Sequence, residues 1–122
     1  MGQGSIIGYE INEKTCQISF YNEKDLEPDT LEVDTDNYQI PLIIGKLRDT
    51  WAYGKEAKRL VTIKDGFTAT RLLSKSLAGD KIEFGEETYD AVWLLSQFIQ
   101  MSLQSFPEID GIVFTVPSLS HS

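Results

Sequence analysis

The sequence is poor in the residues that build self-contained metal and catalytic sites. Its 122 residues include one cysteine, Cys16, and one histidine, His121. A disulfide framework within one chain, a zinc site of the His/Cys type and an active site that combines two histidines are therefore excluded. Cys16 lies in an alternating strand pattern, so we expect an inert packing residue. We expect His121, one residue from the end of the sequence, to be frayed rather than catalytic.

Common sequence signatures are also missing. The sequence has no Gly-x-x-x-x-Gly-Lys-Ser/Thr phosphate loop and no Gly-x-Ser-x-Gly nucleophile elbow. It has no apolar run long enough to span a bilayer, and it does not open with a basic segment followed by an apolar one. We therefore expect a cytoplasmic protein, with residues 1–122 forming a single domain.

Basic residues are outnumbered, and the acidic excess is concentrated. The formal net charge is −8, and seven acidic residues fall between Glu23 and Asp36 with Lys24 as the one base among them. Such a field repels phosphate backbones and anionic lipids, so we expect neither nucleic acid nor a membrane as partner. We interpret the run as a solvated loop or edge strand. A metal-dependent hydrolase that uses these carboxylates stays open as a third hypothesis, although the run lacks the glycine turn and terminal glutamate of a calcium loop.

The first half of the chain has the pattern of a β-hairpin. Ser5 to Ile11 and Thr15 to Tyr21 are predicted strands joined by a tight connection, and Cys16, Ile18 and Phe20 alternate toward one face. Residues Thr30 to Val33 could add a third antiparallel strand. Pro41 cannot donate a hydrogen bond within a sheet, which places the run from Tyr38 to Gly45 at an edge or a strand start.

The second half mixes short strands with helices. Short strands are predicted at Trp51 to Gly54 and at Lys81 to Phe84. A helix at Lys55 to Val61 should bury Ala57, Leu60 and Val61, and a second one should contain Phe67, Leu72, Leu73 and Leu77 and end at Gly79.

The main predicted helix runs from Tyr89 to Phe106. Gly85 to Thr88 should open it, with Glu86 and Glu87 near its positive dipole end. Its apolar stripe comprises Val92, Leu95, Ile99, Leu103 and Phe106. Because Trp93, Leu94 and Phe98 widen this stripe, we expect the helix to be packed on more than one side or to meet a partner. A buried strand from Ile112 to Pro117 should follow, and the helix, a short turn and this strand together should form one half of a β-α-β unit.

Four motifs follow one another along the chain. They are Ile7–Ile11 (Ile-Gly-Tyr-Glu-Ile), then Pro41 with Gly54–Lys58 (Gly-Lys-Glu-Ala-Lys), then Glu86-Glu87 before a long helix, and finally Gly111–Ser118 (Gly-Ile-Val-Phe-Thr-Val-Pro-Ser). In this order they resemble passages of the actin, sugar-kinase and heat-shock-chaperone ATPase superfamily. The resemblance implies an α/β fold: a ribonuclease-H-like mixed sheet with an N-terminal β-hairpin and packed helices. It identifies residues 1–122 with the N-terminal half of an actin-like or chaperone-like ATPase lobe.

The resemblance also implies a site. In that superfamily the first hairpin presents backbone N–H groups and hydroxyls to nucleotide phosphates, and an acid before the turn orients a metal-bound water. Carried over to this chain, the cofactor-binding residues are Gly8, Glu10, Asn12 and Lys14, and Glu10 is the metal-associated residue. The expected cofactors are ATP and Mg²⁺ in an intact parent protein, held in a cleft closed by a second ATPase lobe. No catalytic residue is assigned, and this chain alone should bind ATP weakly or not at all.

The motif is degenerate at the turn itself. Asn12, Glu13 and Lys14 occupy the family's Gly-Thr-Thr positions, so the close-approach glycine and both hydroxyls are missing. Glu13 would repel phosphate oxygens, whereas Lys14 could attract them. In the passage where the chaperones have a phosphate-contacting lysine, Thr70 stands instead. The alternative is therefore a non-catalytic scaffold of the same fold, used for protein contacts. Under either hypothesis we expect self-association through the helix from Tyr89 to Phe106.

Overall fold

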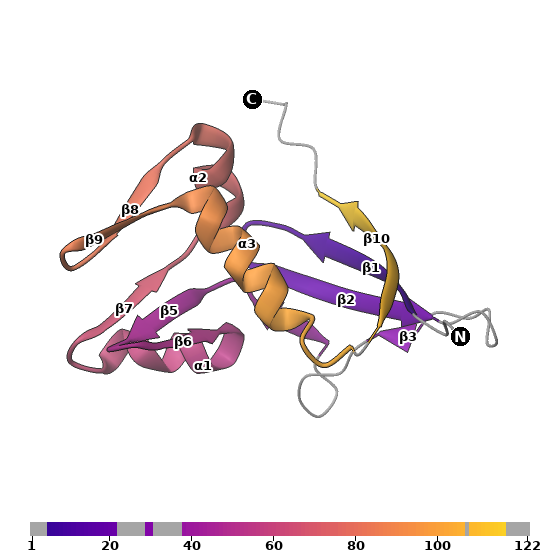
Figure 1. The fold of residues 1–122 in the computed structure, drawn as a ribbon, viewed down its shortest axis with the longest axis horizontal. Coiled ribbons are helices and arrows are strands. Elements are labelled where there is room, and N and C mark those ends of the chain that lie inside the picture. Colours follow the sequence, from indigo (N-terminus) through magenta and orange to yellow (C-terminus); the bar gives the residue numbers. More distant parts are fainter. Residues whose placement is uncertain (1–4, 22–28, 31–37, 107, 117–122) are drawn as a thin grey trace.

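The larger of the sheets in the structure is built on the predicted hairpin. The structure is a computed structural model that describes residues 5–21, 29–30, 38–106 and 108–116. Strands β1 (Ser5–Ile11) and β2 (Thr15–Tyr21) pair antiparallel with the predicted bounds. Strand β10 (Ile109–Thr115) adds parallel to β1, and β3 (Asp29–Thr30) and β4 (Gln39–Pro41) add antiparallel to β2. The sheet is therefore mixed, with the order β10-β1-β2-β3 (Figure 1).

A smaller sheet forms the other end of the molecule. Its order is β6-β5-β7, formed by β5 (Ile44–Leu47), β6 (Thr50–Tyr53) and β7 (Gly66–Ala69). Helix α1 (Gly54–Arg59) and the 3-10 turn η1 (Leu60–Thr62) connect β6 to β7. Gly54 has a φ of +64°, a conformation that favours glycine, and this lets the chain turn sharply from strand into helix.

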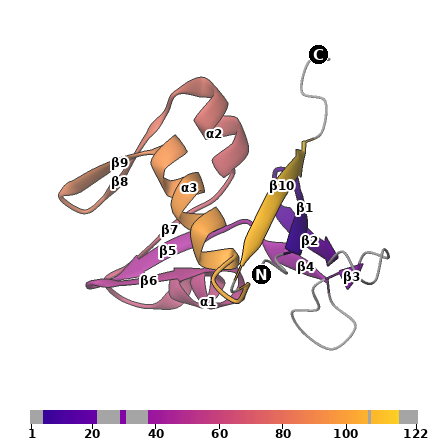
Figure 2. The ribbon, with the colours of Figure 1, turned by 45° about the vertical axis from the view of Figure 1, so that its right-hand side comes forward.

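A separate hairpin and two helices complete the fold. The hairpin consists of β8 (Lys81–Phe84) and β9 (Glu87–Asp90), and the helices are α2 (Leu72–Ala78) and α3 (Ala91–Ser102). Figures 1 and 2 show α3 crossing the molecule between the two ends, with α2 beside it. None of the helices in the described ranges is long and apolar enough to cross a membrane.

The core lies between α3 and the two sheets. Tyr9 from β1 is fully buried, and its hydroxyl hydrogen-bonds the hydroxyl of Ser102 at the end of α3. Phe98 is also fully buried, with its ring edge-on to that of Tyr53 at 5.6 Å between centroids. These contacts join α3 to both sheets, so burial on this helix holds the whole arrangement together.

The start of the main helix was predicted wrongly. Gly85 and Glu86 form the turn of the β8–β9 hairpin, and α3 begins only at Ala91. The φ of +68° at Gly85 reverses the chain there, and Glu87 lies on a strand away from the helix dipole. The helix also ends at Ser102, before Phe106. A glycine followed by two acids reads equally well as a hairpin turn, and the following Thr88-Tyr89 pair favours a strand.

The buried face of α3 differs from the predicted stripe. The buried residues are Ala91, Leu94, Phe98 and Ser102, whereas Val92 is 54% exposed. Both sets have helical spacing, but of the predicted stripe only Leu103, just past the end of the helix, is buried; Leu95 and Ile99 are partly buried against the core, and Val92 faces away from it. Apolar residues surround much of this helix, so periodicity alone could not select the face that is buried.

Three smaller predictions also need correction. Val61 is 65% exposed, because the 3-10 turn there rotates it off the buried side shared by Ala57 and Leu60. Phe67 lies in β7 rather than at the start of a helix, and Leu77 is exposed at the far side of α2. Strand β10 is largely exposed rather than buried. Most of the acidic run, most of the third predicted strand, Pro117 and His121 fall outside the described residues.

Candidate functional site

The β1–β2 turn is the site that the sequence predicts, and its polar groups bond mainly to one another. The Asn12 side-chain Oδ1 accepts hydrogen bonds from the backbone N–H groups of Lys14 at 2.9 Å and Thr15 at 2.8 Å. The Asn12 backbone N–H donates to the Thr15 carbonyl oxygen at 2.9 Å. Because the asparagine side chain accepts these hydrogen bonds, the backbone N–H groups of the turn need no acceptor from another molecule. The backbone N–H groups that a phosphate would need at Lys14 and Thr15 are already satisfied.

Glu10 and Lys14 flank this turn but are not brought together by any contact among the described residues. Glu10 is exposed at the end of β1, in register with Gln17 of β2 and Thr115 of β10. Lys14 is exposed, and its carbonyl oxygen accepts a hydrogen bond from the Leu42 backbone N–H at 2.8 Å. Within the described ranges, no cluster of three His, Cys, Asp or Glu side chains is positioned to hold a metal.

Glu13 is the unusual residue of the turn. Both of its carboxylate oxygens are buried, and neither has a hydrogen-bond partner among the described residues. A buried carboxylate without a partner is costly, and its charge opposes the approach of an anion. The turn as built is therefore unfavourable for an anion.

Gly8 has a packing role inside the sheet. A Cβ atom on Gly8 would lie 2.6 Å from the Ser19 Oγ across the strand pair. The Ser19 hydroxyl fills this space and donates to the Gly8 carbonyl oxygen at 3.4 Å. The glycine at this position makes room for the serine on β2.

We predict that Gly8→Ala lowers the free energy of unfolding by about 1 to 3 kcal/mol, as overpacking does. Ser19→Ala in the same chain should restore most of that loss, because the remaining Ser19 Cβ is 4.0 Å from the new Cβ, which is ordinary contact. Urea unfolding followed by circular dichroism measures both effects. A Gly8→Ala protein as stable as the parent would contradict the packing role of Gly8.

The β1–β2 hairpin itself carries two buried, weakly acidic side chains, Tyr9 on β1 and Cys16 on β2. The Cys16 thiol lies 3.7 Å from the Tyr9 hydroxyl. Burial raises the pKa of Cys16 to about 11 and also raises the pKa of Tyr9 strongly. Both groups stay neutral at physiological pH, so they serve the core rather than nucleophilic chemistry.

A second polar cluster, which sequence reasoning missed, lies at the β8–β9 end. The Lys46 ammonium on β5 is 2.8 Å from Glu87 Oε1 and 3.1 Å from the Tyr89 hydroxyl on β9. It also lies 5.2 Å from the centre of the Trp51 ring. The hydrogen bond with Glu87 raises the pKa of Lys46 to about 12, and the same bond lowers the pKa of Glu87.

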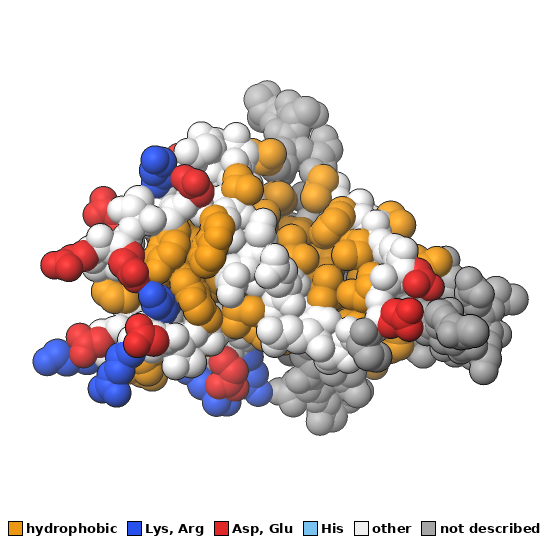
Figure 3. All heavy atoms as spheres, viewed as in Figure 1, with side chains coloured by type: hydrophobic (Ala, Val, Ile, Leu, Met, Phe, Trp, Pro, Cys, Tyr) orange, Lys and Arg blue, Asp and Glu red, His pale blue; other side chains and the backbone are white. Residues whose placement is uncertain are grey.

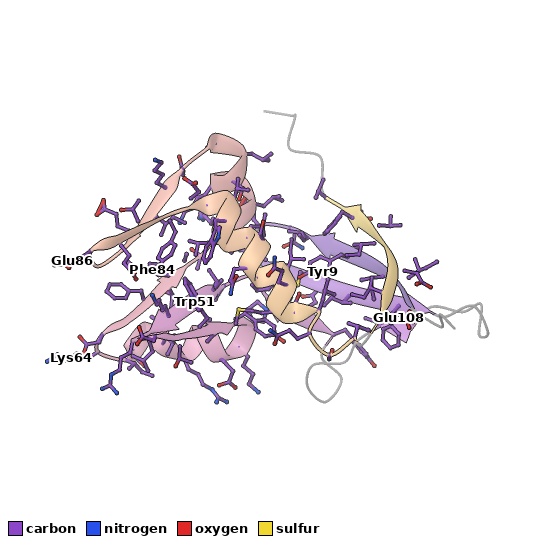
Figure 4. All side chains as sticks on the ribbon, viewed as in Figure 1. Tyr9, Trp51, Lys64, Phe84, Glu86 and Glu108 are labelled. Carbon is purple, nitrogen blue, oxygen red and sulfur yellow. The ribbon has the colours of Figure 1, made fainter. Side chains whose placement is uncertain are left out.

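Aromatic rings surround this ion pair. Trp51 contacts Phe84, Tyr89 and Trp93, and Tyr89 stacks on Trp93 at 5.3 Å with 21° between their planes. Figure 4 shows Trp51 and Phe84 pointing toward one another from the small sheet and the hairpin, and Figure 3 shows hydrophobic side chains gathered on this part of the surface. The cluster attaches the β8–β9 hairpin to the small sheet. Lys46 and Glu87 are 41 positions apart in the sequence. No local sequence pattern could therefore reveal their pairing.

Comparison with solved structures identifies the fold class. A structure of MamK, a non-polymerising mutant bound to AMPPNP, matches with a TM-score of 0.60 and 10% sequence identity. The match covers 100% of this chain and 35% of the MamK chain. At this identity the similarity shows the fold, which is α/β and of the actin-like type, as the resemblance predicted. This chain thus spans about a third of the length of that relative.

Comparison with protein families shows to which family the chain belongs. Residues 27–122 match the model described as the C-terminal part of a family of unknown function, DUF5716. The chain belongs to this family. No curated protein matches its sequence.

Proposed function

We propose that this chain is a non-catalytic module of the actin-like fold that acts as a scaffold for protein contacts. The observation that carries the proposal is the self-capped β1–β2 turn, in which Asn12 Oδ1 accepts the N–H groups of Lys14 and Thr15. A nucleotide phosphate would have to displace this acceptor and approach the unpartnered Glu13 carboxylate. Both steps are unfavourable, and Asn12, Glu13 and Lys14 carry no hydroxyl that would offset them. The hydroxyl of Thr15, the next residue, donates to Asn12 Oδ1 at 3.3 Å.

The second candidate is the nucleotide-binding lobe that the sequence suggested first. The similarity of the fold to MamK, whose structure holds AMPPNP, favours it. On this hypothesis the first phosphate hairpin would be formed by Gly8, Glu10, Asn12 and Lys14. A second lobe would complete the binding site for ATP and Mg²⁺. Lys14 would then act as a phosphate ligand, so any nucleotide binding by this chain, which this hypothesis expects to be weak without the second lobe, should depend on Lys14.

We predict that Asn12→Ala lowers the free energy of unfolding by about 1 to 2 kcal/mol, because two backbone N–H groups lose their acceptor. Lys14→Ala should change stability by less than about 0.5 kcal/mol, since its side chain is exposed. In calorimetric titrations with ATP and Mg²⁺, the parent protein and both variants should show no saturable binding. Saturable binding by the parent that Lys14→Ala weakens would refute the scaffold and support the phosphate hairpin, and a micromolar midpoint would also refute the expectation that this hairpin needs a second lobe to bind ATP.

A further inference from the structure

The start of helix α3 carries an exposed aromatic side chain next to an exposed aliphatic one. Trp93 is 45% exposed, and its neighbour Val92 is 54% exposed. Tyr89 stacks on one side of the Trp93 indole with ring centres 5.3 Å apart, so the exposed part of the ring is open to a ligand. Figure 1 places the start of α3 at the end of the molecule away from β10. This surface is therefore not an edge that a further strand of the mixed sheet would cover.

The hairpin beside this surface is strongly acidic. Residues 80–90 contain five acids against one base, which gives a net charge of −4. The acids are Asp80, Glu83, Glu86, Glu87 and Asp90, and the base is Lys81. Figure 3 shows acidic side chains bordering the hydrophobic ones at this end of the molecule. A surface of this kind attracts cationic groups.

Two of these carboxylates lie next to the exposed aromatic rings. The Glu87 side chain is 60% exposed, and its hydrogen bonds to Lys46 and Tyr89 both use Oε1. Asp90 is exposed and is the N-cap residue of α3, but its side chain makes no capping hydrogen bond. The N-cap side chain and the side chain at the third helical position meet at a helix start, which places Asp90 beside Trp93.

The neighbouring cluster already holds one cation with rings and a carboxylate. The Lys46 ammonium lies 5.2 Å from the centre of the Trp51 ring and 5.7 Å from that of Tyr89, and Glu87 Oε1 is 2.8 Å away. The Lys46 side chain is only 14% exposed, so this cation belongs to the fold. Trp93 presents the same combination of ring and acids to the solvent, and among the described residues no cation lies over its ring.

We propose that Trp93, Asp90 and Glu87 bind an arginine-containing segment of a partner protein. Indole is the best aromatic acceptor for a cation, and a guanidinium can stack on its face while it donates to a carboxylate. Tryptophan, tyrosine and arginine are also the residues that contribute most to binding at protein interfaces. This proposal rests on the proposed scaffold function, for which it names a surface and a class of partner.

Charge selects a basic partner over the other occupants. Two copies of a chain with a net charge of −8 repel one another, which disfavours the self-association through this helix that the sequence suggested. An uncharged apolar segment would cover Val92 and Trp93, but it would take the nearby carboxylates out of water without pairing them. A segment with arginine covers the ring and pairs the acids together.

The test is an NMR titration with a peptide of four arginines alternating with glycines. The chain has two tryptophans, Trp51 and Trp93, so their indole N–H signals report on this surface directly. We expect saturable shifts of the Trp93 indole signal and of the backbone signals of residues 87–93, with a midpoint below about 1 mM. The same peptide with lysine in place of arginine should bind about threefold to tenfold more weakly, because an ammonium cannot stack and pair at the same time.

Two matched acid-to-amide substitutions show whether binding is local. Asp90→Asn removes one charge beside Trp93 and keeps a good N-cap residue, and it should weaken binding of the arginine peptide about twofold to fivefold. Asp110→Asn removes one charge from an exposed position on β10, and it should change the affinity by less than about 1.5-fold. Trp93→Ala should abolish the preference for arginine over lysine.

Four results would overturn the proposal. The first two are no saturable binding of the arginine peptide and equal binding of the arginine and lysine peptides, which would show attraction to net charge alone. The third is a set of shifts concentrated in residues 23–36, which would mean that the peptide meets the acidic run. The fourth is a shift of the Trp93 signal on concentrating the chain without peptide, which would make a second copy the occupant. The titration with ATP and Mg²⁺ tests the scaffold function separately, so the two failures are distinguishable.

Discussion

Replacing Phe98 with alanine is expected to lower the free energy of unfolding by about 3 to 5 kcal/mol. Phe98 is completely buried in α3, and its ring packs edge-on against Tyr53 of the small sheet. Removing the ring takes away a large apolar contact and leaves a cavity between the helix and that sheet. Because domains are stable by only about 5 to 15 kcal/mol, this one change should bring the protein near its unfolding limit.

Urea denaturation with circular dichroism at 222 nm would measure this loss. Val92→Ala is the matched control, since Val92 lies in the same helix and is 54% exposed. Its effect should stay within about 0.5 kcal/mol. Equal effects of the two substitutions would show that the buried face of α3 is not the one described.

Replacing Phe84 with alanine should weaken the packing of the β8–β9 hairpin on the rest of the molecule by a comparable free energy, about 3 to 5 kcal/mol. The hairpin should then be released from the small sheet. Phe84 is 4% exposed and contacts Trp51, Phe67 and Tyr89. The hairpin forms its own two-stranded sheet, so side-chain packing rather than strand pairing holds it to β5–β7. An isolated two-stranded hairpin is at best marginally stable in water, so it should fray once this packing is lost.

Hydrogen exchange distinguishes this local release from global unfolding. In Phe84→Ala, the backbone N–H groups of residues 81–90 should lose protection, while those of β1 and β2 remain protected. Leu77→Ala is the control, because Leu77 is 68% exposed on α2 and should leave exchange unchanged. Uniform loss of protection across both sheets in Phe84→Ala would mean that the hairpin and the core unfold together.

Much of the fold could be predicted from local sequence patterns. Strands β1, β2 and β8 have the predicted bounds because each combines alternation or β-branched residues with turn residues at its ends. The end of α2 was also predicted, since Gly79 adopts a φ of +72° that stops the helix. These features depend on interactions a few residues apart, which are visible in the sequence.

The errors arose where tertiary contacts decide between two local possibilities. Residues 87–90 read as the first turn of a helix, but the packing of Tyr89 on Trp51 and Trp93 holds them as a strand. The exposure of β10 likewise depends on how far α3 reaches across the sheet. Neither contact leaves a periodic signal in the sequence.

The tight turn that holds the candidate site was predicted, but its hydrogen bonding was not. The sequence placed a tight turn at Asn12 to Lys14, and the structure has one there. The capping of Lys14 and Thr15 by Asn12 Oδ1 follows from asparagine chemistry in turns, so the residue type itself carries this signal. The burial of the Glu13 carboxylate depends on the surrounding structure, so the sequence could not have shown it.

On the proposed scaffold function, the β1–β2 turn satisfies its own backbone groups and leaves nothing to hold a nucleotide. The most direct test of this claim is a backbone amide NMR titration of the unmodified chain with AMPPNP and Mg²⁺. We predict that the N–H signals of Asn12, Lys14 and Thr15 show no saturable shift up to about 1 mM ligand, which bounds the binding free energy at about −4 kcal/mol. Saturable shifts confined to those signals with a micromolar midpoint would contradict the claim and restore the turn as a phosphate hairpin.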